Sequence, residues 1–175
     1  YSDTPLDFEE LGENVYINIL NQAKDYVYIA TPYLLISDEM ENALCTAAKR
    51  GVDVRILMPG IPDKPMVFYM AKSYYPPLLE AGVKIYEYTP GFVHAKQILT
   101  EDAAIVGTIN MDYRSYYLHY ENGIWMSGEQ IQEDIRKDFC ATFEESHEVS
   151  YEEWKNRPRR YKFIEPVLNL FSILL

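Results

Sequence analysis

The sequence predicts a single α/β domain built on a mixed, largely parallel sheet with helices on both faces. Short apolar runs that suit buried strands alternate with segments whose apolar residues recur at helical spacing. This alternation favours right-handed crossovers between neighbouring parallel strands. The chain has 175 residues, of which 48% are hydrophobic, and this is enough to form one sizeable core.

The first expected elements are a helix, a strand and a second helix. Apolar residues four apart predict a helix over 11–23, and the apolar run 26–31 before Pro32 predicts a buried strand. Ser37 is expected to cap the N-terminus of the second helix, which ends near Gly51.

The later elements continue this alternation. A helix is predicted over 67–81, with Pro76-Pro77 as a kink or a break. Glu101-Asp102 is expected to form a tight turn between two extended runs. Strands are predicted at 52–59, 83–88, 93–100, 103–107 and 119–127, and a last helix at 129–147.

The chain is predicted to divide into a functional unit, residues 1–150, and a tail, residues 151–175. The tail is expected to be a basic linker followed by an amphipathic helix. Its segment 163–175 is too apolar to be left exposed and too short to span a bilayer. It is therefore expected either to lie on a membrane surface or to dock against a further domain.

The composition argues against several classes of protein. A formal net charge of -11 disfavours a chain that coats nucleic acid, so no nucleic-acid partner is expected. Cys45 and Cys140 are far apart and suit free thiols rather than a zinc site. No transmembrane run or signal peptide is recognisable, so this piece is expected to be soluble. The missing initiator Met suggests that the piece comes from a longer protein.

His94 and Lys96 form a pair that suits phosphate chemistry. Residues two apart on a strand point to the same face, so the imidazole and the ammonium are expected side by side. A histidine can act as nucleophile or general acid, while a lysine stabilises charge on phosphoryl oxygens. Such a reaction requires no metal ion and no other cofactor.

The turn Gly107-Thr108-Ile109-Asn110 is expected to add neutral phosphate donors beside this pair. Its backbone amides, the Thr108 hydroxyl and the Asn110 amide would lie at strand ends, where α/β sheets often bind ligands. The spacing of this turn from His94 is more specific than either piece by itself.

Taken together, the two pieces resemble the phospholipase D superfamily. Its signature is His-x-Lys, four residues, Asp, six residues, then Gly-Ser or Gly-Thr, any residue and Asn. The continuation after the turn resembles the bacterial cardiolipin synthases in particular, as do earlier segments, so the resemblance covers most of the chain. The residues that match the signature in type and order are His94, Lys96, Gly107, Thr108 and Asn110.

The resemblance implies the C-terminal half of a two-domain bacterial enzyme that carries one such motif in each half. The implied reaction transfers a phosphatidyl group between two phosphatidylglycerols through a phosphohistidine. The implied partners are anionic phospholipid, the missing N-terminal phospholipase D-like domain and a membrane surface, with a homodimer as a further option. The parent enzyme would lie at the bacterial cell membrane, with its catalytic part on the cytoplasmic side.

The sequence departs from the signature at the acid. Glu101 stands where the superfamily has Asp, and five residues rather than six separate it from Gly107. Either Glu101 or Asp102 is expected to fill that place. Glu121 lies where the superfamily carries a carboxylate that orients the motif histidine, and it is expected to do so for His94.

Other interpretations of the chain stay open. Two copies could pair to complete a phosphodiesterase or nuclease site, or the chain could be a non-catalytic lipid-binding half. Arg114 and Asp112 either contact substrate or pin the loop after the motif. His119 and His147 have no motif context and are assigned no role.

Overall fold

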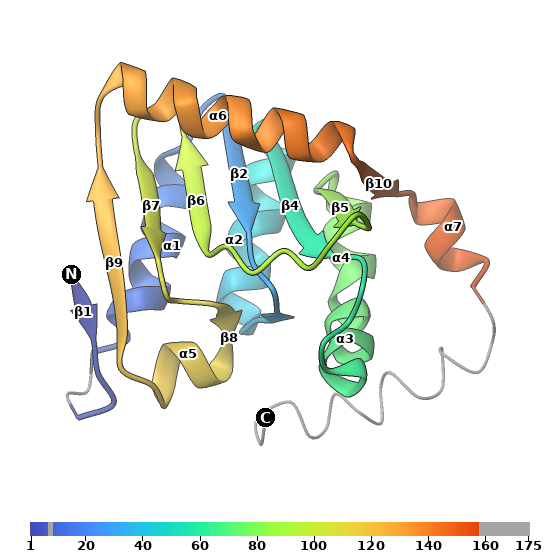
Figure 1. Cartoon of the computed structure of the whole chain (residues 1–175), viewed down its shortest axis with the longest axis horizontal. Coiled ribbons are helices and arrows are strands. Elements are labelled where there is room, and N and C mark those ends of the chain that lie inside the picture. The colour runs from blue at the N-terminus through green and yellow to red at the C-terminus, as the bar shows by residue number, and fades with distance from the viewer. Residues whose placement is uncertain (7–8, 158–175) are drawn as a thin grey trace.

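The computed structural model describes residues 1–6 and 9–157 of the chain (Figure 1). The helices are α1 (Leu11–Gln22), α2 (Asp38–Lys49), α3 (Pro65–Ala71), the 3-10 turn η1 (Lys72–Tyr74), α4 (Tyr75–Ala81), α5 (Tyr113–Tyr117), α6 (Glu129–Glu144) and α7 (Tyr151–Lys155). The strands are β1 (Ser2–Asp3), β2 (Tyr26–Ala30), β3 (Leu34–Leu35), β4 (Asp53–Pro59), β5 (Lys84–Tyr88), β6 (Gln97–Thr100), β7 (Ala104–Gly107), β8 (Met111–Asp112), β9 (Glu121–Met126) and β10 (Ser146–Val149). No helix within the described ranges is long and apolar enough to cross a membrane.

Eight strands form one mixed sheet in the order β1-β9-β7-β6-β2-β4-β5-β10, and β3 pairs with β8 in a separate parallel ladder. The α/β class with a mixed sheet is therefore confirmed. The expected predominance of parallel pairs is wrong, because only β2·β4 and β4·β5 are parallel in the large sheet. The chain reverses direction between β6, β7 and β9, so these strands pair antiparallel.

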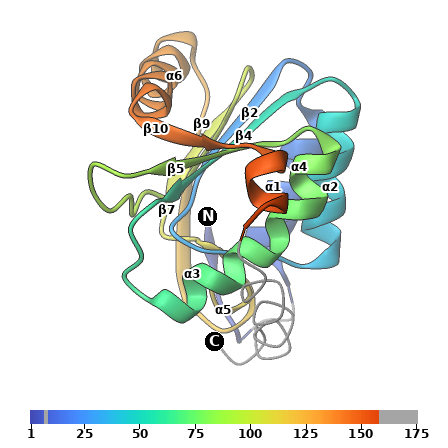
Figure 2. The same ribbon diagram turned by 90° about the vertical axis from the view of Figure 1, so that its right-hand side faces the viewer.

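Helices cover both faces of the sheet, as predicted. Figure 2 shows α6 on one side and α1, α2 and α4 on the other. The larger core lies between these three helices and the sheet, with Tyr16, Leu44 and Leu78 fully buried in it. On the opposite face, Phe139 and Phe143 of α6 pack against apolar side chains of the sheet. Helices thus cover the centre of the sheet on both faces, while Ile124 and Trp125 of β9 stay exposed.

Local signals placed several elements correctly. The Ser37 hydroxyl accepts a hydrogen bond from the Met40 backbone N at 3.0 Å and caps α2, and Gly51 follows that helix with φ +96°. The interruption of the 67–81 helix lies in η1, whereas Pro76 and Pro77 occupy the first turn of α4. Proline fits there because the first helical residues need no N–H partner.

The segment after α6 was not predicted to be ordered in this way. It forms β10, which extends the sheet by pairing antiparallel with β5, and then α7, whose Trp154 packs against the larger core. The predicted division near residue 150 stays a prediction. The expected amphipathic helix in 163–175 lies outside the described residues.

Candidate active site

The motif segment lies at the carboxyl ends of the parallel strands. Gln97, the first residue of β6, is paired with Ala30, the last residue of β2. Residues 93–96 immediately before β6 are irregular, so the expected strand geometry at His94 and Lys96 is wrong. The two side chains nevertheless meet, because Lys96 Nζ lies 2.8 Å from His94 Nδ1 and donates to the His94 carbonyl oxygen at 2.7 Å.

This contact favours one tautomer of the neutral His94 ring. An ammonium group can only donate, so Nδ1 accepts and the neutral imidazole carries its hydrogen on Nε2. Desolvation lowers the pKa of His94, and the neighbouring charge of Lys96 lowers it further. Desolvation also lowers the pKa of Lys96, against the opposing effect of carboxylates led by Glu121. A neutral imidazole is therefore the favoured form at neutral pH.

Gly107 joins the two parts of the motif. Its backbone N donates to the Lys96 carbonyl oxygen at 3.1 Å, which ties the turn to the His-x-Lys segment. A Cβ atom at this position would lie 2.1 Å from the carbonyl oxygen of Asn122 and 2.9 Å from the Cα of Gly123. Only glycine allows this close approach of β7 to β9.

Thr108 and Glu121 are held together beside that junction. The Thr108 hydroxyl donates to the Glu121 carboxylate and accepts from the Asn122 backbone N at 2.9 Å. Glu121 is only 6% exposed, and its second oxygen lies 3.5 Å from His119 Nδ1. Within the described ranges no hydrogen bond joins Glu121 to His94, so the predicted orienting contact is not formed here. The contacts of Glu121 instead fix Thr108.

The residues after the turn build the short helix α5. The Asp112 carboxylate caps this helix by accepting from the Ser115 backbone N at 2.7 Å, and Asn110 Nδ2 donates to the Ser115 hydroxyl at 3.0 Å. Arg114 Nε donates to His119 Nε2 at 3.1 Å. No ion pair between Arg114 and Asp112 is formed in the part of the chain that the structure describes. The two residues therefore order the loop separately rather than as a pair.

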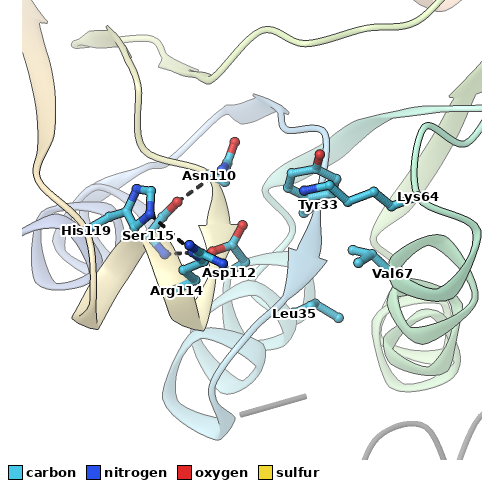
Figure 3. A pocket seen from close by; sticks show the side chains of 9 residues that line it. All are labelled: Tyr33, Leu35, Lys64, Val67, Asn110, Asp112, Arg114, Ser115 and His119. Atoms are coloured by element: carbon cyan, nitrogen blue, oxygen red, sulfur yellow. Dashed lines mark hydrogen bonds between the residues drawn. The ribbon is translucent and has the colours of Figure 1, made fainter. Parts of the chain in front are cut away.

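These side chains form one side of a cavity of about 290 Å³ (Figure 3). The other side carries Tyr33, whose hydroxyl donates to Asp63 at 2.6 Å, and Lys64, whose Nζ lies 5.0 Å from the Tyr33 ring centroid. His94 lines a separate cavity of about 250 Å³ against α6. The residues that line the first cavity are Tyr33, Leu35, Lys64, Val67, Asn110, Asp112, Arg114, Ser115 and His119.

The site is thus a set of basic and hydrogen-bonding side chains at the carboxyl ends of the parallel strands, with two separate cavities. Among the described residues, no group of three or more His, Cys, Asp or Glu side chains is placed to hold a metal ion. What the arrangement offers chemically is a neutral imidazole, an ammonium beside it, and fixed donors from the turn.

The family model of the cardiolipin synthase, PLD-like domain matches residues 16–142. The chain belongs to this family. Among curated relatives, a protein of Streptococcus mutans is 55% identical over the whole chain. Cardiolipin synthases of Alkalihalophilus pseudofirmus and Geobacillus kaustophilus are 39% and 40% identical over 95% of it. The chain spans 38% of the length of the first relative and 33% of each of the other two.

Solved structures support the fold of this PLD-like domain. Phosphatidylserine synthase of Haemophilus influenzae superimposes with a TM-score of 0.75 at 18% identity, over 97% of this chain and 46% of that one. Nuc of Salmonella typhimurium, a phospholipase D family member, superimposes with a TM-score of 0.69 at 16% identity, over 78% of this chain and 90% of that one.

The acid of the PLD-like signature lies away from the other motif residues. Glu101 Oε1 accepts from the Lys24 backbone N at 2.7 Å, at the end of β6 opposite to His94. The four residues of β6 separate the two ends by about 13 Å. Which of Glu101 and Asp102 fills the acid position of the signature stays a prediction, but at this end of β6 neither carboxylate lies beside His94. The acid closes the turn instead.

His119 is the site residue that sequence reasoning missed. Its ring lies between Arg114 and Glu121, and it lines the same cavity as Asn110. Because Arg114 Nε donates to Nε2, the neutral ring of His119 carries its hydrogen on Nδ1, the atom that faces Glu121. The only signal in the sequence was proximity to Glu121, two residues away, and that signal alone does not distinguish a site residue from a surface histidine.

Proposed function

We propose that this chain is the C-terminal half of a cardiolipin synthase, with His94 as one of two motif histidines in phosphatidyl transfer. The observation that carries the proposal is the junction of the two motif parts, in which Lys96 contacts the His94 ring while its carbonyl oxygen binds Gly107. Membership of the cardiolipin synthase family over most of the chain supports it.

The proposed reaction has two displacements. In the first, Nε2 of one motif histidine attacks the phosphorus of a phosphatidylglycerol, and the bond to the leaving glycerol breaks. The other motif histidine, which lies in the opposite half of the enzyme from the nucleophile, protonates that glycerol. In the return step the hydroxyl of a second phosphatidylglycerol attacks, its proton returns to the second histidine, and the P–N bond breaks. Two phosphatidylglycerols thus give cardiolipin and glycerol.

This chain supplies groups for one side of that reaction. Lys96 and the Asn110 amide would stabilise the charge on the phosphoryl oxygens, and the Thr108 hydroxyl would do so only by giving up its hydrogen bond to Glu121. Attack by His94 would require a lone pair on Nε2, so Nδ1 would have to exchange the Lys96 contact for an acceptor. In the arrangement described, His94 is instead a neutral ring whose Nε2–H can donate a hydrogen bond to a phosphoryl oxygen, and it would have to become the imidazolium before it could act as the general acid. We place the parent enzyme at the bacterial membrane, with its active side towards the cytoplasm.

The decisive test uses the parent protein in vesicles of phosphatidylglycerol. His94→Ala is expected to lower cardiolipin formation at least about 10³-fold, because acid-base catalysis or the nucleophile is lost. His147→Ala is the matched control, since this exposed histidine lies on β10, the last strand of the sheet, and contacts Glu153. Cardiolipin and released glycerol are both quantified. Unchanged cardiolipin formation by His94→Ala would show that the chain is a non-catalytic half.

A second candidate is a site completed by two copies of this chain. The observation that favours it is the superposition on Nuc, which covers 90% of the Nuc chain. A chain with this fold can therefore consist of little more than one such domain. The chain has one His-x-Lys motif, and the 175-residue chain alone is expected to be inactive as a monomer. Phosphodiesterase activity that rises with chain concentration, together with a dimer in sedimentation, would favour this candidate instead.

A further inference from the structure

Two cations face the Figure 3 cavity without a carboxylate partner. In the described ranges, five Lys and Arg side chains form ion pairs with carboxylates, and Lys64 and Arg114 are among those that form none. A chain with 27 acidic and 16 basic residues has ample carboxylates to pair with them. Their position on one cavity is thus a local concentration of positive charge in an acidic chain.

Arg114 is held in a way that leaves its phosphate-binding groups free. Its Nε donates to His119, and the other ring nitrogen of His119 lies 3.5 Å from the buried Glu121 carboxylate. The two terminal amino groups of the guanidinium are not used by any hydrogen bond within the described residues. These are the groups with which arginine binds phosphate oxygens in a bidentate manner.

Lys64 supplies a second positive charge from the other side. It precedes α3, fifty residues before Arg114 in the sequence, and Figure 3 shows the two on opposite sides of the cavity. Its ammonium lies over the ring of Tyr33. Asp112 also lines the cavity, but one of its oxygens already accepts from the Ser115 backbone N. An anion between the two walls would therefore meet two cations and the Asp112 carboxylate, one oxygen of which accepts from a backbone N–H.

The size of the cavity limits what the anion can be. A volume of about 290 Å³ is at the lower end of ligand pockets, which begin at about 300 Å³. This space suits a polar headgroup and excludes a lipid with its acyl chains. Asn110 of the motif turn lines the same cavity, so a bound headgroup would adjoin the proposed reaction centre.

We propose that this cavity binds the phosphodiester headgroup of the acceptor phospholipid, with Arg114 and Lys64 as the ligands of its phosphate. The inference rests on the proposed function, in which an acceptor hydroxyl resolves the phosphohistidine. Arg114 and Lys64 hold the acceptor so that its hydroxyl oxygen reaches the phosphorus as the P–N bond breaks, and the hydroxyl proton passes to the basic histidine. His119 is a positioning residue that holds the Arg114 guanidinium.

Binding is tested on the 175-residue chain with glycerophosphoglycerol, the soluble headgroup of phosphatidylglycerol, by titration calorimetry. Arg114→Gln and Lys64→Gln are each expected to weaken binding at least tenfold, whereas Arg136→Gln and Lys137→Gln on α6 leave it unchanged. Lys64 is exposed and its ammonium contacts the Tyr33 ring, so Lys64→Gln should leave folding intact. Absence of binding, equal binding by all variants, or equally tight binding of inorganic phosphate would each overturn the proposal.

A second measurement separates this proposal from the proposed function. In the parent protein, water competes with the acceptor lipid, and the phosphohistidine then gives phosphatidic acid instead of cardiolipin. Arg114→Gln is expected to lower the ratio of cardiolipin to phosphatidic acid at least tenfold, with donor consumption changed less than threefold. An unchanged ratio argues against the acceptor site alone. A wild-type parent that forms neither product refutes the proposed function, while the calorimetry still decides whether the cavity binds the headgroup.

Discussion

The two ends of β6 are built differently, although the same sequence signature spans both. At the His94 end the backbone is irregular, the Lys96 ammonium contacts the His94 ring, and His94 faces a cavity. At the Glu101 end the side chains bind backbone groups: Glu101 accepts from the Lys24 N, and the Thr100 hydroxyl accepts from the backbone N of Asp102 and of Ala103. The His94 end of β6 therefore has side chains available to a ligand, whereas the side chains at the Glu101 end are used to stabilise a turn.

This difference teaches that a signature residue need not lie at the reacting atoms. A turn one residue shorter than the family pattern, with Glu in place of Asp, is tolerated where the side chain only has to reach a backbone N–H. The His94 end, in contrast, depends on the close approach of β7 and β9 at Gly107. Substitutions at the two ends should therefore affect different properties of the protein.

The largest expected effect on stability is at Gly107. Gly107→Ala would place a Cβ 2.1 Å from the Asn122 carbonyl oxygen, so β7 and β9 must separate, at a cost of about 3 kcal/mol. Gly91→Ala is the control, because a Cβ there meets only the Tyr88 ring, at 3.6 Å, and should change stability by less than about 0.5 kcal/mol. Urea unfolding of the wild type and of the two variants measures the change in the free energy of unfolding. Equal midpoints for the two variants would contradict the close packing at Gly107.

A smaller effect is expected at the turn end. Glu101→Ala removes the acceptor of the Lys24 backbone N and should destabilise the fold by about 1 kcal/mol. Because this turn is far from His94, cardiolipin formation by the parent protein should stay within threefold of the wild type. Asp102→Ala serves as the comparison at the neighbouring exposed position. A hundredfold loss of activity in Glu101→Ala with an unchanged unfolding midpoint would show instead that Glu101 acts in the active site.

The smallest effect is a shift in the titration of His94. Desolvation and the charge of Lys96 both disfavour the imidazolium, so the pKa of His94 is expected below its usual value of about 6.5. Lys96→Met removes the second cause and should raise that pKa towards the usual value. Histidine ring signals followed by NMR against pH give both midpoints, with His119→Ala and His147→Ala to assign the signals. A lower midpoint in Lys96→Met would contradict the Lys96 contact.

Much of the fold could be predicted because its signals are local. Apolar periodicity found α1, α2 and α6, and the Ser37 cap and Gly51 stop needed only neighbouring residues. Strand direction could not be read in this way, because periodicity shows which residues are buried but not which strands are adjacent. β10 was missed because Val149 is the only buried residue in its four, so the strand has no apolar alternation.

The site was predictable in its residue types and less so in its geometry. His94 and Lys96 were expected to meet because of strand alternation, but they meet because the Lys96 side chain turns back onto the His94 carbonyl oxygen. The Arg114–His119 contact depends on how α5 ends before β9, which no spacing rule predicts. Lys64 and Tyr33 come from two other loops, and only the folded chain brings them to the cavity.

The β6–β7 hairpin gives the two halves of this site different folding costs. Lys96 and Gly107 are brought together by a short hairpin, so this part closes a small loop and loses little chain entropy. Lys64 faces Arg114 across the cavity and lies fifty residues earlier in the sequence, so this arrangement requires a much longer loop to close. The motif can therefore form early in folding, and the cavity beside it is completed late.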